Sequence, residues 1–254
     1  MDTSIPSPHP DPADPRVSVV IPAYNEAESL PTLVSEIRSA LFRETWELLI
    51  VDDGSVDETP GTLADLAARE PRLRAFRIPT RRGQSAALAA GIGLARGEIV
   101  VTLDADLQND PADIPRLLDA LEGWDVVSGV RVRRRDTWLR RTASRVANAV
   151  RRWVLEDGIS DVGCSLKIYR RAVLEGVPSF NGFHRFLPVL AQMGGARVRE
   201  FPVHHRARLH GKSSYGVRNR LGRGIVDLFG VRWLKRRHVD PHEARALANP
   251  RNNE

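Results

Sequence analysis

Short apolar runs alternate with helix-forming stretches through the first half of the 254-residue chain. The runs at residues 17–21, 47–51, 73–78 and 97–102 are rich in β-branched and other apolar residues and predict strands. Residues 30–41, 59–69 and 84–95 between them predict helices. Strands and helices that alternate at these lengths are joined by right-handed crossovers and form a mainly parallel sheet. We therefore expect a single α/β domain with a Rossmann-like sheet flanked by helices.

Polar clusters follow three of these strands, at residues 22–26, 52–55 and 104–108. Pro22 should end the first strand, and Thr59, which precedes Pro60, should cap the second helix. Ligands of parallel sheets gather at the carboxyl ends of the strands. We expect the three clusters to meet in one crevice.

Asp104 and Asp106 follow the apolar run at residues 97–102. Residues two apart on an extended chain point to the same side, so the two carboxylates should face one pocket, about 7 Å apart or less. They repel each other unless a cation lies between them, and Mg²⁺ or Mn²⁺ prefers such oxygen ligands together with substrate phosphates. Gln108 adds a neutral oxygen. The pattern predicts a divalent metal site.

A helix N-terminus is the simpler explanation for the acidic residues just downstream. Asp110, followed by Pro111 and Asp113, is typical of a capped helix start. Capping accounts for Asp110 and Asp113 but leaves Asp104 unexplained at the end of an apolar strand, so the metal site is the preferred interpretation.

The charge balance suits an anionic partner. The chain has 38 Lys and Arg against 32 Asp and Glu, a net charge of +6, and most of the excess arginine lies downstream of Gly129. This charge suits a phosphate-bearing or membrane-surface partner, and it also serves solubility. The single Cys164 excludes an internal disulfide and fits a cytoplasmic compartment. We expect no membrane span and no signal peptide.

The second half predicts further strands at residues 125–130, 163–169 and 197–203 and a helix at residues 185–193. Another helix should point Leu139, Val146, Val150 and Val154 inward. Its other faces, and the run before it, carry arginines expected in solvent or against lipid: Arg133, Arg134, Arg135, Arg151 and Arg152.

The ends of the chain differ from the domain between them. Residues 1–15 should form a disordered tail and residues 239–254 a polar tail. Residues 217–238 predict a basic amphipathic helix, either packed on the domain or lying in a membrane interface.

Four motifs stand in order along the chain. They are Val20-Ile21-Pro22-Ala23-Tyr24-Asn25-Glu26, Val51-Asp52-Asp53-Gly54-Ser55, Asp104-Ala105-Asp106-Leu107-Gln108, and His205-Arg206 followed by Gly211-Lys212-Ser213-Ser214-Tyr215-Gly216. This set resembles the signature of family 2 glycosyltransferases, and within them the dolichol-phosphate mannosyltransferase (polyprenyl-phosphate glycosyltransferase) branch. The resemblance implies a GT-A catalytic domain over residues 16–216.

The resemblance also implies a nucleotide-sugar donor, GDP-mannose or a UDP-sugar. Tyr24 offers a stacking face and Asp53 an acceptor for a base N–H. Metal ligands would be Asp104, Asp106 and Gln108, holding Mg²⁺ or Mn²⁺. The implied donor-binding residues are Pro22, Tyr24, Glu26, Val51, Asp53, Asp104, Ala105, Asp106, Gln108, Arg206 and Lys212. The implied catalytic residues are Asp106, Arg131, Arg140, Arg141 and Ser144, the last four holding phosphates.

The implied acceptor is a polyprenyl or dolichyl phosphate at a membrane surface, with a membrane-anchoring subunit as a further partner. A phosphate with a second pKa near 6 is already an oxyanion at neutral pH, so it needs no general base. Each close pair of unit charges costs about 4 kcal/mol at 4 Å near a protein surface, and a divalent ion with several guanidinium groups reverses that sign. We therefore predict in-line attack and inversion at a mannose- or glucose-like sugar.

Other functions remain open at this point. A sugar-hydroxyl acceptor of the cell envelope would need a carboxylate base, for which Asp157 and Asp161 are candidates. A non-catalytic basic module that binds membrane or nucleic acid would explain the arginines but not Asp104 and Asp106, so we expect no nucleic acid partner.

Two further features of the sequence limit these interpretations. His204, His205 and His210 suggest zinc, but successive strand residues point to opposite sides. Arg81-Arg82-Gly83 stands where the family pattern leads us to expect an Asn-Gly pair, so the donor-side loop departs from that pattern.

Overall fold

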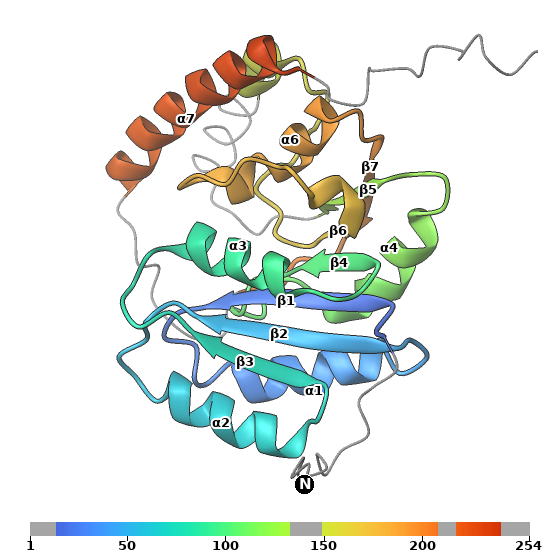
Figure 1. Cartoon of the computed structure of the whole chain (residues 1–254), viewed down its shortest axis with the longest axis vertical. Helices are drawn as coiled ribbons and strands as arrows, with labels where there is room; N and C mark the ends of the chain where they lie inside the picture. Colours follow the sequence, from blue (N-terminus) through green and yellow to red (C-terminus); the bar gives the residue numbers. More distant parts are fainter. Residues whose placement is uncertain (1–13, 133–148, 208–216, 240–254) are drawn as a thin grey trace, which may run out of the picture.

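The computed structural model describes residues 14–132, 149–207 and 217–239 (Figure 1). In the last helix the described side chains are those of residue 224 and of residues 226–237. One seven-stranded sheet, in the order β3-β2-β1-β4-β6-β5-β7, runs through the domain. All neighbouring strands are parallel except where β6 pairs with β4 and β5. The predicted mainly parallel α/β sheet in a single domain is confirmed.

The strands match the predicted runs closely in the first half of the chain. Their bounds are β1 Val17–Ala23, β2 Trp46–Asp52, β3 Leu73–Arg77, β4 Ile99–Thr102, β5 Val126–Arg131, β6 Lys167–Arg170 and β7 Val198–Val203. The prediction began too early for β6, because residues 162–163 form a turn and residues 164–166 are irregular in front of the strand.

The helices follow in the expected places. They are α1 Leu30–Ala40, α2 Thr59–Arg69, α3 Gln84–Leu94, α4 Ile114–Ala120, α6 Leu187–Met193 and α7 Val217–Arg237. Short 3-10 turns, η1 Pro111–Asp113 and η3 Phe183–Arg185, lead into α4 and α6. Residues 149–155 are also helical. Asp110 caps η1 through a hydrogen bond from the Ala112 N–H, as the capping pattern predicted.

Two hydrophobic cores cover the two faces of the sheet, as alternation along the strands requires. Val19 of β1 and Val101 of β4 contribute to the core under α1, α2 and α4. Val20 and Val100, one residue away, contribute to the core under α3, α6 and α7. The helices α2 and α7 cover opposite faces of the sheet, and they also lie at opposite ends of the molecule (Figure 1).

Pro22 does not end the first strand, contrary to the prediction. β1 continues to Ala23 and pairs with β2 along its whole length. β4 pairs with β1 only up to Val20, so beyond that point β1 has a neighbour on one side only. Pro22 lies in this edge-like part, where its missing N–H costs no ladder hydrogen bond.

Thr59 does not cap α2 but is its first residue, so this prediction was also wrong. Its hydroxyl oxygen accepts the backbone N–H of Glu26 at 2.9 Å, and its own N–H donates to Asp57 Oδ1 at 3.0 Å. Thr59 therefore ties the turn after β1 to the start of α2.

The helix at residues 149–155 differs from its prediction at two positions. Val154 is buried as expected, but Val150 is 48% exposed. Arg151, expected in solvent, is buried and ion-paired with Asp157, and its guanidinium also donates to the carbonyl of Ile159.

Several predicted features lie outside the described residues. They are nearly all of the two tails, Leu139 and Val146 of the predicted arginine-rich helix, the loop at residues 211–216, and the side chains of Arg133, Arg134, Arg135, Arg140, Arg141, Ser144, His210 and Lys212.

Candidate active site at the carboxyl edge of the sheet

The first two polar clusters meet at the carboxyl ends of β1 and β2. The backbone N–H of Asn25 donates to Ser55 Oγ at 2.9 Å, and the Asn25 side-chain oxygen accepts the N–H of Val56 at 3.0 Å. The Asp53 N–H donates to the Ala23 carbonyl at 2.8 Å. The turns after the two strands thus form one surface, as their position in the sheet predicted.

A third segment, residues 80–83 before α3, is fastened onto this surface. Both oxygens of the buried Asp53 carboxylate accept backbone N–H groups, from Arg82 and from Gly83, each at 2.7 Å. Gly54 has a φ of +69°, and a Cβ there would lie 2.7 Å from the Arg81 backbone nitrogen. The close approach of these two segments therefore requires glycine at position 54.

Tyr24 and Arg81 lie at the centre of the predicted nucleoside region. The Arg81 guanidinium carbon is 3.8 Å from the centroid of the Tyr24 ring, a cation–π contact. The aromatic face expected to stack on a base is therefore covered on one side by a residue of the donor-side loop.

Other predicted donor-binding residues are more buried than the sequence suggested. Val51 and Ala105 are buried as whole residues, 1% and 3% exposed, so their side chains are covered by the protein. Pro22 and Glu26 are half-buried, and Glu26 Oε2 accepts the Ser29 hydroxyl at 3.1 Å. The roles of these residues in donor binding stay predictions.

The carboxylate pair lies just past the end of β4. Asp106 is 6% exposed, and its Oδ1 accepts the Gln108 backbone N–H at 3.2 Å. Asp104 is half-buried, and its Oδ1 accepts the Gln84 side-chain amide at 2.7 Å. Burial and the neighbouring Asp106 carboxylate raise the pKa of Asp104 to about 6. The two carboxylates are therefore close enough to repel each other.

The donor set suits Mg²⁺ or Mn²⁺. Within residues 14–132, 149–207 and 217–239 no group of three or more His, Cys, Asp or Glu side chains is arranged for a metal. Magnesium commonly takes one or two carboxylates and completes its shell with water and substrate phosphates. Asp104 and Asp106, with the half-buried Gln108 beside them, fit that mode of binding.

Two cationic side chains lie near Asp104, one being Lys167 of the segment 161–167 and the other Arg131 at the end of β5, which is bound to that segment. Lys167 is 3% exposed and donates to the carbonyls of Val162, at 3.2 Å, and Cys164. Arg131 makes a bidentate ion pair with Asp161, both contacts being 2.8 Å. The positive charges of Lys167 and Arg131 lower the pKa of Asp104 and oppose the effect of burial.

This segment is held against β4 by polar contacts that sequence reasoning missed. Thr102 Oγ1 donates to the Ser165 carbonyl at 2.8 Å, and the Asn109 amide donates to Ser165 Oγ at 2.7 Å. Lys167 could have indicated these contacts in the sequence, because a charged residue within an apolar strand needs polar partners, as Asp104 does.

The two predicted phosphate-binding arginines that the structure describes are already paired. Arg131 is bound to Asp161, and Arg206 forms ion pairs with Glu36 at 2.8 Å and Asp110 at 2.7 Å. The backbone N–H of Arg206 donates to the Gln108 carbonyl at 2.7 Å, which brings the His-Arg motif beside the motif at residues 104–108. Arg140, Arg141, Ser144 and Lys212 lie outside the described residues.

The sheet order and the helical layers are those of a GT-A fold. A mannosyltransferase from Pyrobaculum calidifontis, solved in complex with GDP-Man and Mn²⁺, has a TM-score of 0.66 and 25% identity, covering 92% of this chain and 68% of that one. Glucosyl-3-phosphoglycerate synthase from Mycobacterium tuberculosis, solved with Mn²⁺ and UDP-glucose, shares the fold with a TM-score of 0.64 and 22% identity, covering 86% of this chain and 79% of that one. The model of the family described as Glycosyl transferase family 2 matches residues 18–177. The chain belongs to glycosyl transferase family 2.

Two curated relatives at more than 40% identity carry the same name. The undecaprenyl-phosphate 4-deoxy-4-formamido-L-arabinose transferase of Enterobacter sp. (strain 638) is 43% identical over 205 residues, which are 79% of this chain and 62% of the relative. The protein of that name from Aeromonas hydrophila is 41% identical over 205 residues, 79% of this chain and 63% of the relative. The chain thus spans less than two thirds of the length of these relatives.

Proposed function

We propose that this protein transfers a sugar from a nucleotide-sugar donor to the phosphate of a polyprenyl phosphate, with inversion at the anomeric carbon. Membership of the family and the names of the relatives at 41–43% identity support this assignment. The donor is GDP-mannose or a UDP-sugar, by the likeness to structures solved with GDP-Man and with UDP-glucose.

The choice of acceptor rests on the ion pairs that the two candidate bases, Asp157 and Asp161, form within the protein. A sugar hydroxyl would need a free carboxylate nearby. Asp157 is buried against Arg151, and both oxygens of Asp161 are bound to Arg131. A phosphate acceptor is already ionised at neutral pH and needs no such base. The pairing of both candidates therefore favours a lipid phosphate.

The residues of the site have separable roles in the proposed reaction. Tyr24 and the turn at Asp53 would hold the nucleoside, and Arg206 would exchange its carboxylate partners for phosphates as the substrates enter. Arg131 would add its positive charge while it stays bound to Asp161. A phosphate oxygen of the acceptor then attacks the anomeric carbon, and the nucleoside diphosphate leaves from the opposite side. Mg²⁺ or Mn²⁺ held by Asp104, Asp106 and Gln108 would neutralise the departing diphosphate.

The proposed location is the cytoplasmic face of a membrane, because the acceptor is a lipid and Cys164 is a free thiol. No helix within the described part of the chain is long and apolar enough to cross a membrane. A membrane-anchoring subunit remains a proposed partner.

Transfer to a short-chain polyprenyl phosphate tests the proposal. Asp106→Ala should abolish transfer in the presence of Mn²⁺ while thermal unfolding is unchanged, and the exposed Asp65 of α2 supplies the control variant Asp65→Ala. Undiminished turnover in Asp106→Ala would refute the metal site. Transfer to a soluble saccharide without any lipid would refute the phosphate acceptor.

Donor identity can be settled without the acceptor. Each nucleotide sugar is added with and without Mn²⁺, and the unfolding temperature is followed. The correct donor at 100 times its Kd should add about 2.7 kcal/mol of stability, and this gain should vanish in Asp106→Ala. A gain that is the same for every nucleotide would indicate binding of the diphosphate alone.

A further inference from the structure

The helix α7 is apolar on two opposite faces, and only one of them is packed. Leu228 and Val231 are 8% and 0% exposed and belong to the core under α3 and α6. Val226, Phe229 and Trp233 are 71%, 60% and 57% exposed. At about 100° per residue these three lie within one narrow stripe, roughly opposite Val231. We call Val226, Phe229 and Trp233 the outer stripe.

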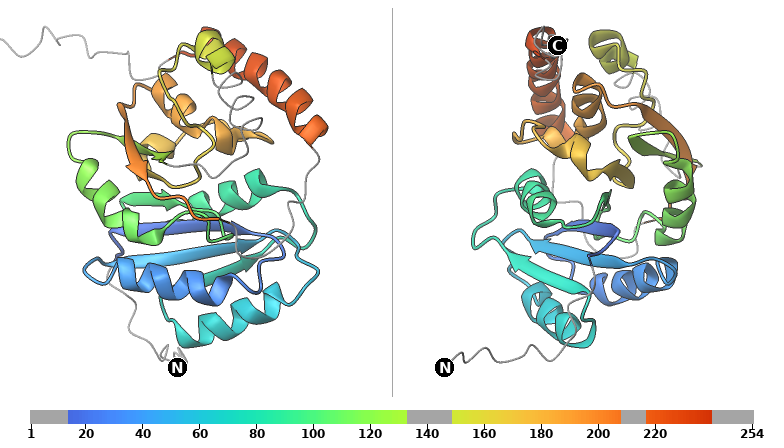
Figure 2. Two further views of the ribbon diagram at one scale, coloured as in Figure 1. Left: turned by 180° about the vertical axis from the view of Figure 1, so that it is seen from behind. Right: turned by 45° about the vertical axis from the view of Figure 1, so that its right-hand side comes forward.

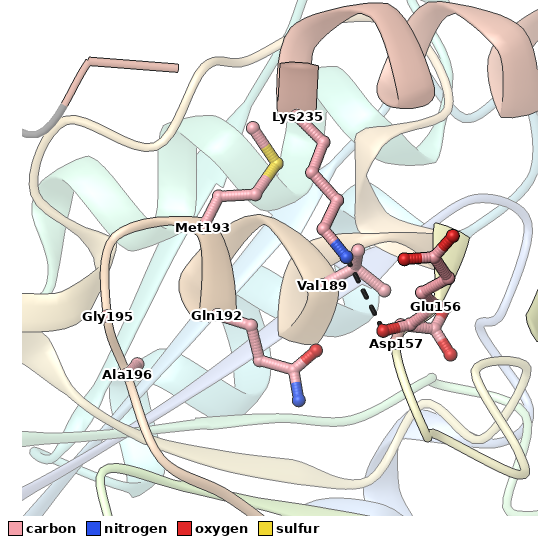
Figure 3. Close-up of a pocket in the computed structure, with 8 residues that line it drawn as sticks. All are labelled: Glu156, Asp157, Val189, Gln192, Met193, Gly195, Ala196 and Lys235. Carbon is pink, nitrogen blue, oxygen red and sulfur yellow. Dashed lines mark hydrogen bonds between the residues drawn. The ribbon is translucent and has the colours of Figure 1, made fainter. Parts of the chain in front are cut away.

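This outer stripe corrects the simple amphipathic pattern read from the sequence, in which all apolar residues of α7 share one face. The inner face is fixed by more than Leu228 and Val231. Arg232 donates to the Val154 carbonyl, and Lys235 donates to the Leu155 carbonyl. Figure 3 shows Lys235 crossing from α7 toward Glu156, beside Val189 and Gln192 of α6. Because the inner face is anchored, α7 cannot rotate to bury the outer stripe.

The neighbouring helix at residues 149–155 carries a second exposed apolar group. Trp153 is 80% exposed and Val150 48% exposed. The hydrogen bonds from Arg232 and Lys235 end on the last turn of this helix, so it lies against α7. Both helices lie at the same end of the molecule (Figure 2).

The charges beside the outer stripe have one sign. Arg236 and Arg237 are exposed and fall on the same side of α7 as Trp233, and the Arg237 guanidinium lies 5.6 Å from the Trp233 ring centroid. Among the described side chains of α7 the acidic one is Asp227, which is 17% exposed and paired with Arg185. Exposed aromatic residues bordered by arginine match the interface of an anionic bilayer, where the ring enters the headgroup region and the cations meet lipid phosphates.

We infer that the outer stripe of α7, together with Trp153, docks the protein on the surface of an anionic lipid bilayer. The inference rests on the proposed function in one respect, because a membrane-bound acceptor gives such docking its purpose. The lipid bilayer would contact a surface that is distinct from the carboxylate pair of Asp104 and Asp106.

Vesicles without polyprenyl phosphate and without nucleotide sugar test docking alone. The wild-type protein should sediment with vesicles of phosphatidylcholine and phosphatidylglycerol and much less with pure phosphatidylcholine, and its tryptophan emission should shift to the blue. Phe229→Ala with Trp233→Ala should weaken partition by about tenfold or more, because two apolar rings no longer enter the interface. Arg236→Gln with Arg237→Gln should weaken it by about 30-fold on anionic vesicles.

The turn after α1 supplies a matched control. Phe42 is 70% exposed and has the Arg43 guanidinium 5.0 Å from its ring centroid, so it repeats the Trp233 and Arg237 arrangement elsewhere on the surface. Phe42→Ala with Arg43→Gln should leave partition unchanged. Equal loss in this control, or no binding of the wild type to anionic vesicles, would overturn the inference.

Two further readouts separate the alternatives. If the wild type forms dimers without vesicles and Trp233→Ala abolishes them, a second copy covers the stripe and the lipid inference fails. Transfer to a short-chain polyprenyl phosphate in solution should be unaffected in the stripe variants. For the wild type, absence of binding to anionic vesicles with intact transfer would refute docking alone, whereas vesicle binding without transfer would refute the proposed function alone.

Discussion

The ion pair between Arg131 and Asp161 allows a test of both stability and mechanism. Asp161→Asn keeps the size of the side chain and one acceptor oxygen but removes the negative charge. In the structure Asp161 accepts two guanidinium N–H groups at 2.8 Å and the Arg131 backbone N–H at 3.3 Å. The two side chains are 18% and 8% exposed, so solvent screens the pair only weakly.

The expected cost follows from those contacts. A hydrogen bond to a charged group contributes about 1.5–3 kcal/mol, and leaving a largely buried guanidinium without its partner costs about 3–5 kcal/mol. Asn retains part of the hydrogen bonding, so we expect Asp161→Asn to lower the free energy of unfolding by about 2–4 kcal/mol. For a chain of this size, 1 kcal/mol lowers Tm by about 2–4 °C, which gives a decrease of roughly 4–16 °C.

Urea unfolding and thermal scans of Asp161→Asn, Arg131→Gln and the double variant measure the coupling between the two residues. The control is Asp125→Asn, because Asp125 pairs with Arg197 at 3.2 Å but the two side chains are 23% and 65% exposed. An exposed pair contributes at most about 1 kcal/mol. A loss below 1 kcal/mol in Asp161→Asn, equal to that of the control, would refute the account of this pair as a buried structural clamp.

The same variant separates the two acceptor classes. If Asp161 were a general base for a sugar hydroxyl, its removal should abolish turnover at every pH. With a phosphate acceptor, Asp161→Asn frees Arg131 but leaves the chemical step intact, so turnover measured below the lowered Tm should persist.

Three further predictions concern single side chains. Burial raises the pKa of the Cys164 thiol to about 11, so the thiol stays neutral up to that pH. Alkylation of Cys164 should therefore be very slow at pH 8 and accelerate only toward pH 11. Rapid alkylation at pH 7 would contradict this prediction. Burial alone would raise the pKa of Glu47, but hydrogen bonds from Arg96, Arg74 and Ser18 hold it below its usual range. Glu47 therefore stabilises the folded protein at pH values above the pKa that Glu47 has in the unfolded chain, and this stabilisation is lost as pH falls through its pKa in the folded protein. Glu47→Gln should lower the free energy of unfolding, measured in urea, by about 2–3 kcal/mol at pH 7 and by much less at pH 3. Arg81→Ala should weaken nucleoside diphosphate binding about tenfold in calorimetry, because a guanidinium beside the nucleoside region attracts the anion; an unchanged Kd would exclude Arg81 from the donor site.

The fold and the convergence of the polar clusters could be predicted because they depend on short-range patterns. Apolar runs fixed the strands, and parallel pairing then placed the turns after β1, β2 and β4 at one edge. Pro22 misled the prediction because its effect depends on whether β4 still runs beside β1 at that point, which is a property of the sheet and not of the local sequence.

Arg151 shows a different limit. Its position on a polar helix face predicted solvent, yet it is buried with Asp157. The partner is reached only because the chain turns back after the helix, with positive φ values at Glu156 and Gly158. A charge pattern along a helix carries no information about such a turn, so pairing across it was not predictable.

Side-chain pairing also changes how the site is understood. Sequence reasoning treated Arg131, Arg206 and Asp53 as groups waiting for a ligand, whereas each is bound within the protein. Opposite charges gathered around an anion-binding site satisfy one another when no substrate is present. In the proposed reaction, substrate phosphates would therefore compete with Glu36 and Asp110 for Arg206, and part of the binding energy would go into that exchange.

Three consecutive residues at the start of α3 connect the parts of the site that the sequence analysis treated separately. The Gly83 N–H is held by Asp53 at the nucleoside side, and the Gln84 amide is bound to Asp104 in the carboxylate pair. Ser85 Oγ lies 2.7 Å from His184 Nδ1 and accepts the Gly182 N–H at 2.8 Å, in the second half of the chain. A displacement of this helix start would therefore move the turn at Asp53, the Asp104 side chain and the segment before α6 together. The geometry of the proposed site thus depends on these four short hydrogen bonds and not on the two aspartates alone.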